Sequence, residues 1–219
     1  MVPLAGLIDT AFLGHLSEVR FLNGVALATV IFNVVYWGFN FFRMGTTGPT
    51  AQAVGKGDEA EVWLIWARIT LVALGAGVWV VLLQKPIAAV GFGLLQASPG
   101  VREAAIAFFN GRILGAPAVL VNFVLLGWLL GRSQGKAVIV LAIIGNSSNI
   151  GLDYWIILVM GCGSYGAGLA TAISQYIMLS AGLVLLLAGS VPWQLWPVIR
   201  ARLWQGAALR SLFGLNRDI

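Results

Sequence analysis

Two asparagines and an aspartate interrupt an apolar run over residues 142–160, AIIGNSSNIGLDYWIILVM. Asn146, Asn149 and Asp153 are three and four residues apart, so on a helix their side chains lie on one face. A second acid, Asp9, lies within another apolar run at residues 1–16. An unpaired carboxylate is costly at membrane depth. We therefore expect both acids to face a cavity, to find partners or to hold a proton.

Two carboxyl groups in such surroundings suit one of two kinds of chemistry. Burial disfavours the charged carboxylate, and a second carboxyl group nearby disfavours it further for one of the pair, which suits proton exchange. Carboxylate and amide oxygens also suit a small hard cation, so Asp9 and Asp153 are candidate sodium ligands. The structural alternative is that both acids only form hydrogen bonds to neighbouring helices.

Asn146 is a candidate for the lining of the same pocket, together with Asn33, Trp37 and Gln175. Asn33 and Trp37 share one helical face, and Thr171 and Gln175 share another. Hydrogen bonding between helices explains these polar side chains equally well. Pro117 interrupts another apolar run and predicts a bend, because proline removes one helical hydrogen bond.

The composition is that of an integral membrane protein. Hydrophobic residues make up 59% of the 219 residues and charged residues only 10%, too few to cover a soluble globule. The net charge of +5 comes from 13 scattered Lys and Arg residues against 8 acids, without the basic stripe of a nucleic-acid-binding protein. A single cysteine excludes an internal disulfide framework and a zinc cluster.

The apolar runs predict an all-α fold of six transmembrane helices, since a span needs about 20 mostly apolar residues. The first run is a few residues short and resembles a helix whose beginning is missing. Residues 191–219, rich in Trp and Arg, predict an amphipathic segment at the cytoplasmic interface. The predicted spans cover residues 1–16, 24–49, 62–84, 104–130, 137–160 and 165–190.

The basic residues of the loops predict the orientation, because Lys and Arg are retained on the cytoplasmic side. With the loop between the second and third spans inside, the inner side carries seven basic residues and the outer side three. Both chain ends are therefore expected in the cytoplasm. Trp63 and Trp66 are expected in the interfacial aromatic belt.

Four sequence blocks, in order, resemble the multidrug and toxic compound extrusion (MATE) family, in its DinF-like branch. They are GLIDTAFLGHL (6–16), NFFRMGTTGPTAQAVGKGD (40–58), GNSSNIGLDYWIILVMGCGSYGAGLATAISQY (145–176) and LNRDI (215–219). Members of this family are typically twelve-helix antiporters. Two six-helix lobes surround a central cavity and expel organic cations in exchange for protons or sodium ions. The chain resembles the N-terminal lobe, with LNRDI similar to the start of a seventh helix.

This resemblance implies roles for individual residues. Asp9 matches the acid of the family's first helix and Asp153 that of the fifth, both implicated in cation coupling. Asn149 and Thr171 match positions that complete the same polar pocket. The resemblance also implies a multi-pass transporter of the inner (plasma) membrane, not an enzyme, with no cofactor beyond the coupling ion. Its expected partners are the lipid bilayer, a small organic cation, and a second lobe or a second copy of the chain.

Two other classes remain as alternatives. An intramembrane aspartyl protease also needs two aspartates but would show Gly-x-Gly-Asp, whereas Asp153 follows NIGL. The stronger rival is a truncated, non-transporting membrane protein or a half-transporter that requires a partner lobe, because alternating access usually involves two repeats moving about a midplane site.

Overall fold

The computed structural model describes residues 19–188, 197 and 201, and within these residues all regular structure is helical. Asp9, the whole first predicted span and nearly all of residues 191–219 lie outside the described residues. The helices are α2 (Val19–Gly38), α3 (Phe41–Gly55), α4 (Glu59–Leu82), α5 (Gln84–Leu94), α6 (Pro99–Arg112), α7 (Ala116–Gly131), α8 (Gly135–Asp153) and α9 (Gly163–Ala188). A 3-10 turn, η1 (Ile113–Gly115), and a π-helix, η2 (Tyr154–Val159), complete the described elements.

Five helical stretches are long and apolar enough to cross a membrane, which confirms five of the six predicted spans. The shortest has 24 residues, or about 36 Å at the helical rise, more than the hydrocarbon thickness of a bilayer. Their ends differ from the predicted ends by a few residues. The spans are Arg20–Gly55, Glu59–Leu82, Pro99–Gly131, Gly135–Val159 and Gly163–Ala188.

Two spans are longer than a bilayer requires, with 36 and 33 residues, and both are interrupted. The first is divided into α2 and α3 by a turn at Phe39 and Asn40. The second is divided into α6 and α7 by the single 3-10 turn η1. Pro117 stands in the first turn of α7, where its missing N–H removes a bond to the preceding turn. The α-helix is therefore interrupted next to Pro117, and the bend predicted there stays a prediction.

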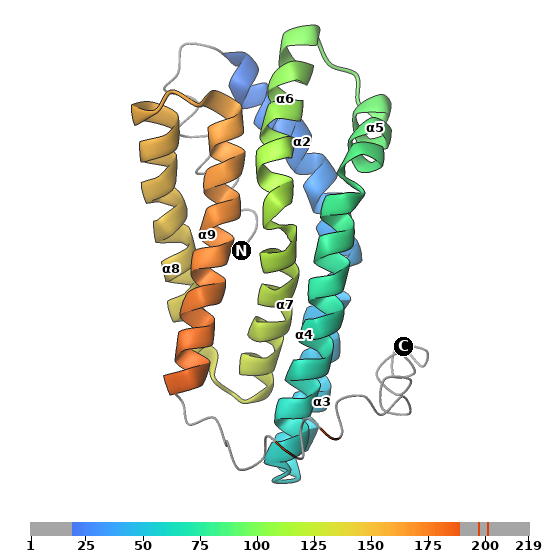
Figure 1. The fold of residues 1–219 in the computed structure, drawn as a ribbon, viewed down its shortest axis with the longest axis vertical. Helices are drawn as coiled ribbons and strands as arrows, with labels where there is room; N and C mark the ends of the chain where they lie inside the picture. Colours follow the sequence, from blue (N-terminus) through green and yellow to red (C-terminus); the bar gives the residue numbers. More distant parts are fainter. Residues whose placement is uncertain (1–18, 189–196, 198–200, 202–219) are drawn as a thin grey trace.

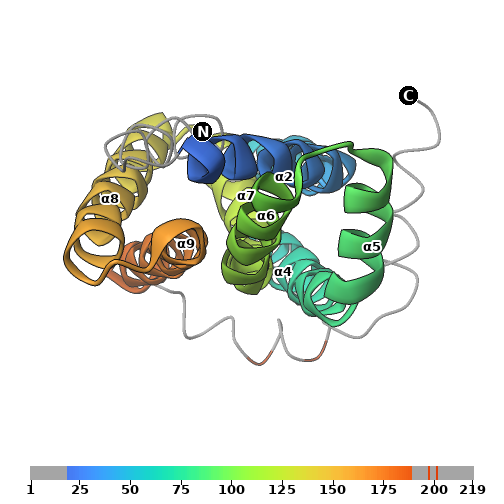
Figure 2. The same ribbon diagram turned by 90° about the horizontal axis from the view of Figure 1, so that it is seen from above.

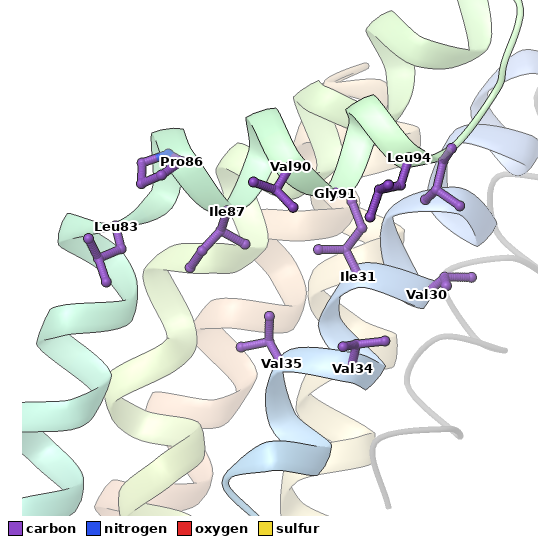
Figure 3. Close-up of a pocket in the computed structure, with 11 residues that line it drawn as sticks. Val30, Ile31, Val34, Val35, Leu83, Pro86, Ile87, Val90, Gly91 and Leu94 are labelled. Carbon is purple, nitrogen blue, oxygen red and sulfur yellow. The ribbon is translucent and has the colours of Figure 1, made fainter.

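Helix α5 was not predicted. It follows α4 after Leu83 and stands beside α2 at one side of the bundle (Figures 1 and 2). Between α2 and α5 lies a groove with a volume of about 520 Å³, and its lining side chains are apolar. Val34, Ile87, Val90 and Leu94 are among them (Figure 3). Apolar side chains in such a groove are favourable where the surrounding solvent is lipid.

Helix α7 occupies the centre of the bundle together with α6, and α2, α4 and α9 surround them (Figure 2). Glycines of α7 allow α3 to approach closely. A Cβ atom placed on Gly127 would lie 2.5 Å from the Arg43 carbonyl oxygen, and one on Gly131 would lie 2.7 Å from the Thr47 carbonyl oxygen. Small residues at such crossings are the usual way in which membrane helices pack.

Tryptophans at one end of the bundle form a cluster, which corrects part of the predicted aromatic belt. Trp63 is 7% exposed and its ring centroid lies 5.0 Å from that of Trp128. The Trp128 indole N–H donates to the Val62 carbonyl oxygen at 2.9 Å, and the Arg132 guanidinium lies 4.6 Å from the Trp128 ring centroid. Because α4 and α7 cross here, Trp63 is buried between helices and not at the lipid interface.

Candidate functional site

Asn149 and Asp153 lie on the buried face of α8. Leu141, Gly145, Asn149 and Asp153, each four residues after the previous one, are all buried. Asn149 is 1% exposed and Asp153 fully buried. Asn146 lies at the edge of this face and is half-buried. The helical period therefore directs the amide of Asn149 and the carboxyl group of Asp153 into protein and not into lipid.

Asp153 stands where the α-helix gives way to a π-helix. Residues Tyr154–Val159 are π-helical, and the Met160 N–H donates to the Trp155 carbonyl oxygen, five residues earlier, at 2.9 Å. The chain then turns into α9 through Gly161 and Gly163, whose φ angles are +68° and +51°. Such π-segments are rare and occur frequently at functional sites.

Two close contacts set the antiparallel register of α8 and α9. A Cβ atom on Gly145 would lie 3.1 Å from the Met178 sulfur, and one on Gly166 would lie 2.8 Å from the Ile156 Cγ2 atom. Between these two contacts, Asp153 is level with residues 169–170 of α9, less than one turn from Thr171. Asn149 is level with residues 173–174 by the same register.

Thr171 is 4% exposed and faces into the bundle. Its hydroxyl group donates to the Ala167 carbonyl oxygen at 3.1 Å, and a hydroxyl oxygen can also accept hydrogen bonds. The Ser174 hydroxyl group donates to the Thr171 carbonyl oxygen at 2.8 Å. A carboxyl group, an amide and a hydroxyl group are thus buried at similar depths on two neighbouring helices.

A small cavity opens beside Thr171. Its volume is about 20 Å³, which is enough for one water molecule. We call it the Arg112 cavity; its lining residues are Tyr36, Arg112, Gly115, Val119, Thr171, Ala172 and Gln175. Arg112 and Tyr36 were not predicted from the sequence. The available signal was a charged residue inside the predicted span 104–130.

A second cavity, the amide cavity, lies further along α9. Its volume is about 40 Å³, and its lining includes the amide side chains of Asn122, Asn146 and Gln175. The Asn122 amide nitrogen donates to the backbone oxygen of Gln175 at 3.0 Å and to its side-chain oxygen at 3.2 Å. Because Gln175 lines both cavities, it connects Asn146 with the surroundings of Thr171.

The other two predicted lining residues lie elsewhere in this structure. Asn33 and Trp37 are exposed on α2, and Trp37 is 82% exposed. The Arg112 cavity and the amide cavity include neither of them.

A metal centre built from three or more acidic, His or Cys side chains is absent from the described residues. Sodium binding between Asp9 and Asp153 stays a prediction, because Asp9 lies outside them.

Comparison with known protein families shows a match to MatE over residues 1–155 of the chain. The whole chain is 38% identical over 218 residues to DNA damage-inducible protein F of Escherichia coli K12, and covers 47% of that protein. It is also 29% identical over 180 residues to the probable multidrug resistance protein NorM of Thermotoga maritima; this match includes 80% of the chain and 38% of that protein.

Solved structures show the same fold. A multidrug resistance MATE family transporter of the MOP superfamily in its inward-facing conformation superposes with a TM-score of 0.77 at 22% identity, over 85% of this chain and 42% of that one. A MOP superfamily transporter from Pyrococcus furiosus superposes with a TM-score of 0.76 at 22% identity, over 90% of this chain and 46% of that one. The chain thus spans about half the length of the proteins that it matches.

Proposed function

Because the chain belongs to the MatE family of multidrug efflux transporters and corresponds to the N-terminal half of their fold, we propose that it carries the ion-coupling pocket of an antiporter. The antiporter expels small organic cations in exchange for protons or sodium ions. The chain is a multi-pass protein of the inner membrane, and its family is one of transporters and not of enzymes.

One observation carries this proposal: Asp153 and Asn149 are buried on the face of α8 that meets α9, each within about one turn of the level of Thr171. Ionisable residues inside transmembrane helices mark ion and substrate pathways by default. We name Asp9, Asn149, Asp153 and Thr171 the coupling pocket. Asp9 joins them by its match to the family's first-helix acid.

The mechanism that we propose is competition for negative charge. A cationic drug is attracted by the ionised acids of the pocket, and this attraction is strong because the surroundings have a low dielectric constant. A proton or sodium ion that enters from outside neutralises that charge and weakens the hold on the drug. Release of the ion on the inner side restores the affinity. The ion and the drug need no direct contact, only a shared charge or a shared conformational equilibrium.

Transport also needs a second lobe, because alternating access involves two repeats that move against each other. A second polypeptide segment of the same family, or a second copy of this chain, would supply it. The alternative function is that of a half-transporter that is inactive until such a partner lobe is present, and it is motivated by the coverage of only 47% of the E. coli relative.

The test replaces each acid with its neutral isostere, Asp153→Asn and Asp9→Asn. The assay follows gradient-driven efflux of a fluorescent organic cation from proteoliposomes that contain this chain assembled with a partner lobe. We expect both variants to lose the dependence of export on the ion gradient. Asp58→Asn is the matched control, because Asp58 caps α4 at its N-terminus and keeps an acceptor as asparagine.

Normal rates and normal gradient dependence in both pocket variants would show that the acids are structural. Loss of activity in the Asp58→Asn control as well would mean that the assay reports folding and not coupling.

A further inference from the structure

Tyr36 lies in the last turn of α2, next to the turn that separates α2 from α3, and is 4% exposed. The Phe39 N–H in that turn donates to the Tyr36 carbonyl oxygen at 3.1 Å. The Tyr36 ring stacks on Phe32, with ring centroids 5.7 Å apart, and meets Phe123 edge to face, with centroids 6.4 Å apart. Two aromatic neighbours therefore hold this ring inside the bundle.

The Tyr36 hydroxyl group is buried and has no hydrogen-bond partner within the part of the chain that the structure describes. A buried hydroxyl group that stays unpaired costs the free energy of its lost hydration. In folded proteins such groups are therefore nearly always paired, either with protein or with ordered water. The described side chains offer this hydroxyl group no partner, so an ordered water molecule is the candidate.

The Arg112 cavity offers a place for that water molecule. Tyr36 lines this cavity together with the polar side chains of Arg112, Thr171 and Gln175. Its volume of about 20 Å³ exceeds the roughly 10–15 Å³ that one water molecule requires. Apolar cavities stay dry, whereas water enters a cavity that supplies about two to four polar partners. The cavity meets both conditions, because four of its seven lining residues are polar.

The lining side chains complement the donors and acceptors of one water molecule. The Tyr36 hydroxyl group can donate to it. The Thr171 hydroxyl group donates to the Ala167 carbonyl oxygen, and the Thr171 oxygen can accept from water. The side-chain oxygen of Gln175 accepts from Asn122 at 3.2 Å, and the amide NH₂ group of Gln175 can donate. These groups supply the roughly three hydrogen bonds that are typical of a buried water molecule.

We propose that the Arg112 cavity binds one ordered water molecule, which bridges the Tyr36 hydroxyl group on α2 to Thr171 and Gln175 on α9. The bridge holds the last turn of α2 against α9, beside the turn at which the span Arg20–Gly55 is divided. This inference goes beyond the proposed function and does not depend on it. Its tests measure hydration and stability and not transport.

The first experiment detects the water molecule directly, in this chain assembled with a partner lobe in nanodiscs. Brief X-ray irradiation converts bound water into hydroxyl radicals, which oxidise the side chains that touch it, and mass spectrometry locates the added oxygen. We expect oxidation at the buried Tyr36. Phe32 is the matched control, because its ring stacks on Tyr36, is 0% exposed and is not part of the cavity lining. We expect Phe32 to stay unlabelled.

Labelling of Tyr36 without labelling of Phe32 would support the bound water molecule. An unlabelled Tyr36 would overturn it. Equal labelling of both rings would also overturn it, because water would then reach Tyr36 through opening of the bundle and not at a bound site.

The second experiment uses the sign of a stability change in mixed micelles. Tyr36→Phe removes only the hydroxyl group. If this group is bonded to water, its loss lowers the denaturant midpoint of unfolding; if it is unpaired, its loss removes a desolvation cost and raises the midpoint. We expect a midpoint below that of the wild type. Tyr176→Phe is the matched control and should lower the midpoint in either case, because the Tyr176 hydroxyl group donates directly to the Leu114 carbonyl oxygen at 2.9 Å.

Thr171→Val tests whether one water molecule joins the two helices, because it removes the second hydroxyl group and keeps the side-chain shape. If both hydroxyl groups bond the same water molecule, the midpoint shifts of Tyr36→Phe and Thr171→Val are not additive. Additive shifts, or a raised or unchanged midpoint in Tyr36→Phe, would overturn the bridge. A Tyr36→Phe shift present in sodium chloride and absent in sodium gluconate would overturn it too, since a chloride ion beside Arg112 would then be the occupant.

Discussion

A single methyl group at Gly111 should destabilise the bundle, because the backbones of α6 and α9 touch there. In Gly111→Ala the new Cβ atom would lie 2.6 Å from the Tyr165 carbonyl oxygen and 2.8 Å from the Leu169 nitrogen. Both are backbone atoms of a helix, so no flexible side chain can move aside. The clash can be relieved only if the two helices separate, and this movement would also take Arg112 away from Thr171.

The expected size follows from two opposing effects. Overpacking of a tight site costs about 1–3 kcal/mol. Replacing glycine with alanine inside a helix contributes about 0.5–1 kcal/mol in the opposite direction. We therefore expect Gly111→Ala to have a free energy of unfolding about 1–3 kcal/mol lower than that of an alanine variant that gains the same helix propensity without a clash.

Gly75→Ala is the matched control. Gly75 lies in α4, is exposed, and a Cβ atom placed there would meet no heavy atom within 4 Å. This variant should keep the helix-propensity gain and create no clash. The assay is reversible unfolding in mixed micelles, followed by circular dichroism, with the midpoint and slope compared between the two variants. If Gly111→Ala were as stable as Gly75→Ala, the close contact of α6 and α9 would be refuted.

Two further substitutions test the end of the bundle at which α4 begins, by the same unfolding assay. Trp128→Phe removes the hydrogen bond from the indole N–H to the Val62 carbonyl oxygen and should cost about 0.5–1.5 kcal/mol; a change within error would mean that this bond contributes nothing. Asp58→Ala removes the carboxylate that accepts from the Glu61 N–H at 3.0 Å at the start of α4 and should cost about 1 kcal/mol. Asp58→Asn should retain most of that stability, and equal losses in the Ala and Asn variants would contradict a capping role.

The sequence alone predicted the membrane class and five of the described spans, because both depend on local properties. Apolar length is enough to recognise a helix that crosses a bilayer. The helical period is enough to place Asn149 and Asp153 on one face, and the cost of exposing an acid to lipid is enough to turn that face inward. These predictions need no knowledge of which helices are neighbours.

The predictions that failed concerned contacts between helices or a further helix that follows directly after a span. α5 was missed because Gln84, Lys85 and Pro86 follow an apolar run and are typical of the loop after a span. Trp63 was expected at the lipid interface, since an amphipathic ring suits that place as well as a helix crossing. The sequence does not distinguish the two environments for such a side chain.

Arg112 shows what only the tertiary structure decided. The sequence places a charge within an apolar run but does not say which helix receives it. Its approach to Thr171 depends on Gly111, Gly115 and Gly168, three small residues that let the backbones of α6 and α9 meet. Helical periodicity defines the face of each helix, whereas the crossing of two helices depends on side-chain volumes at residues more than fifty positions apart. That crossing brings the guanidinium group and Thr171 to one cavity.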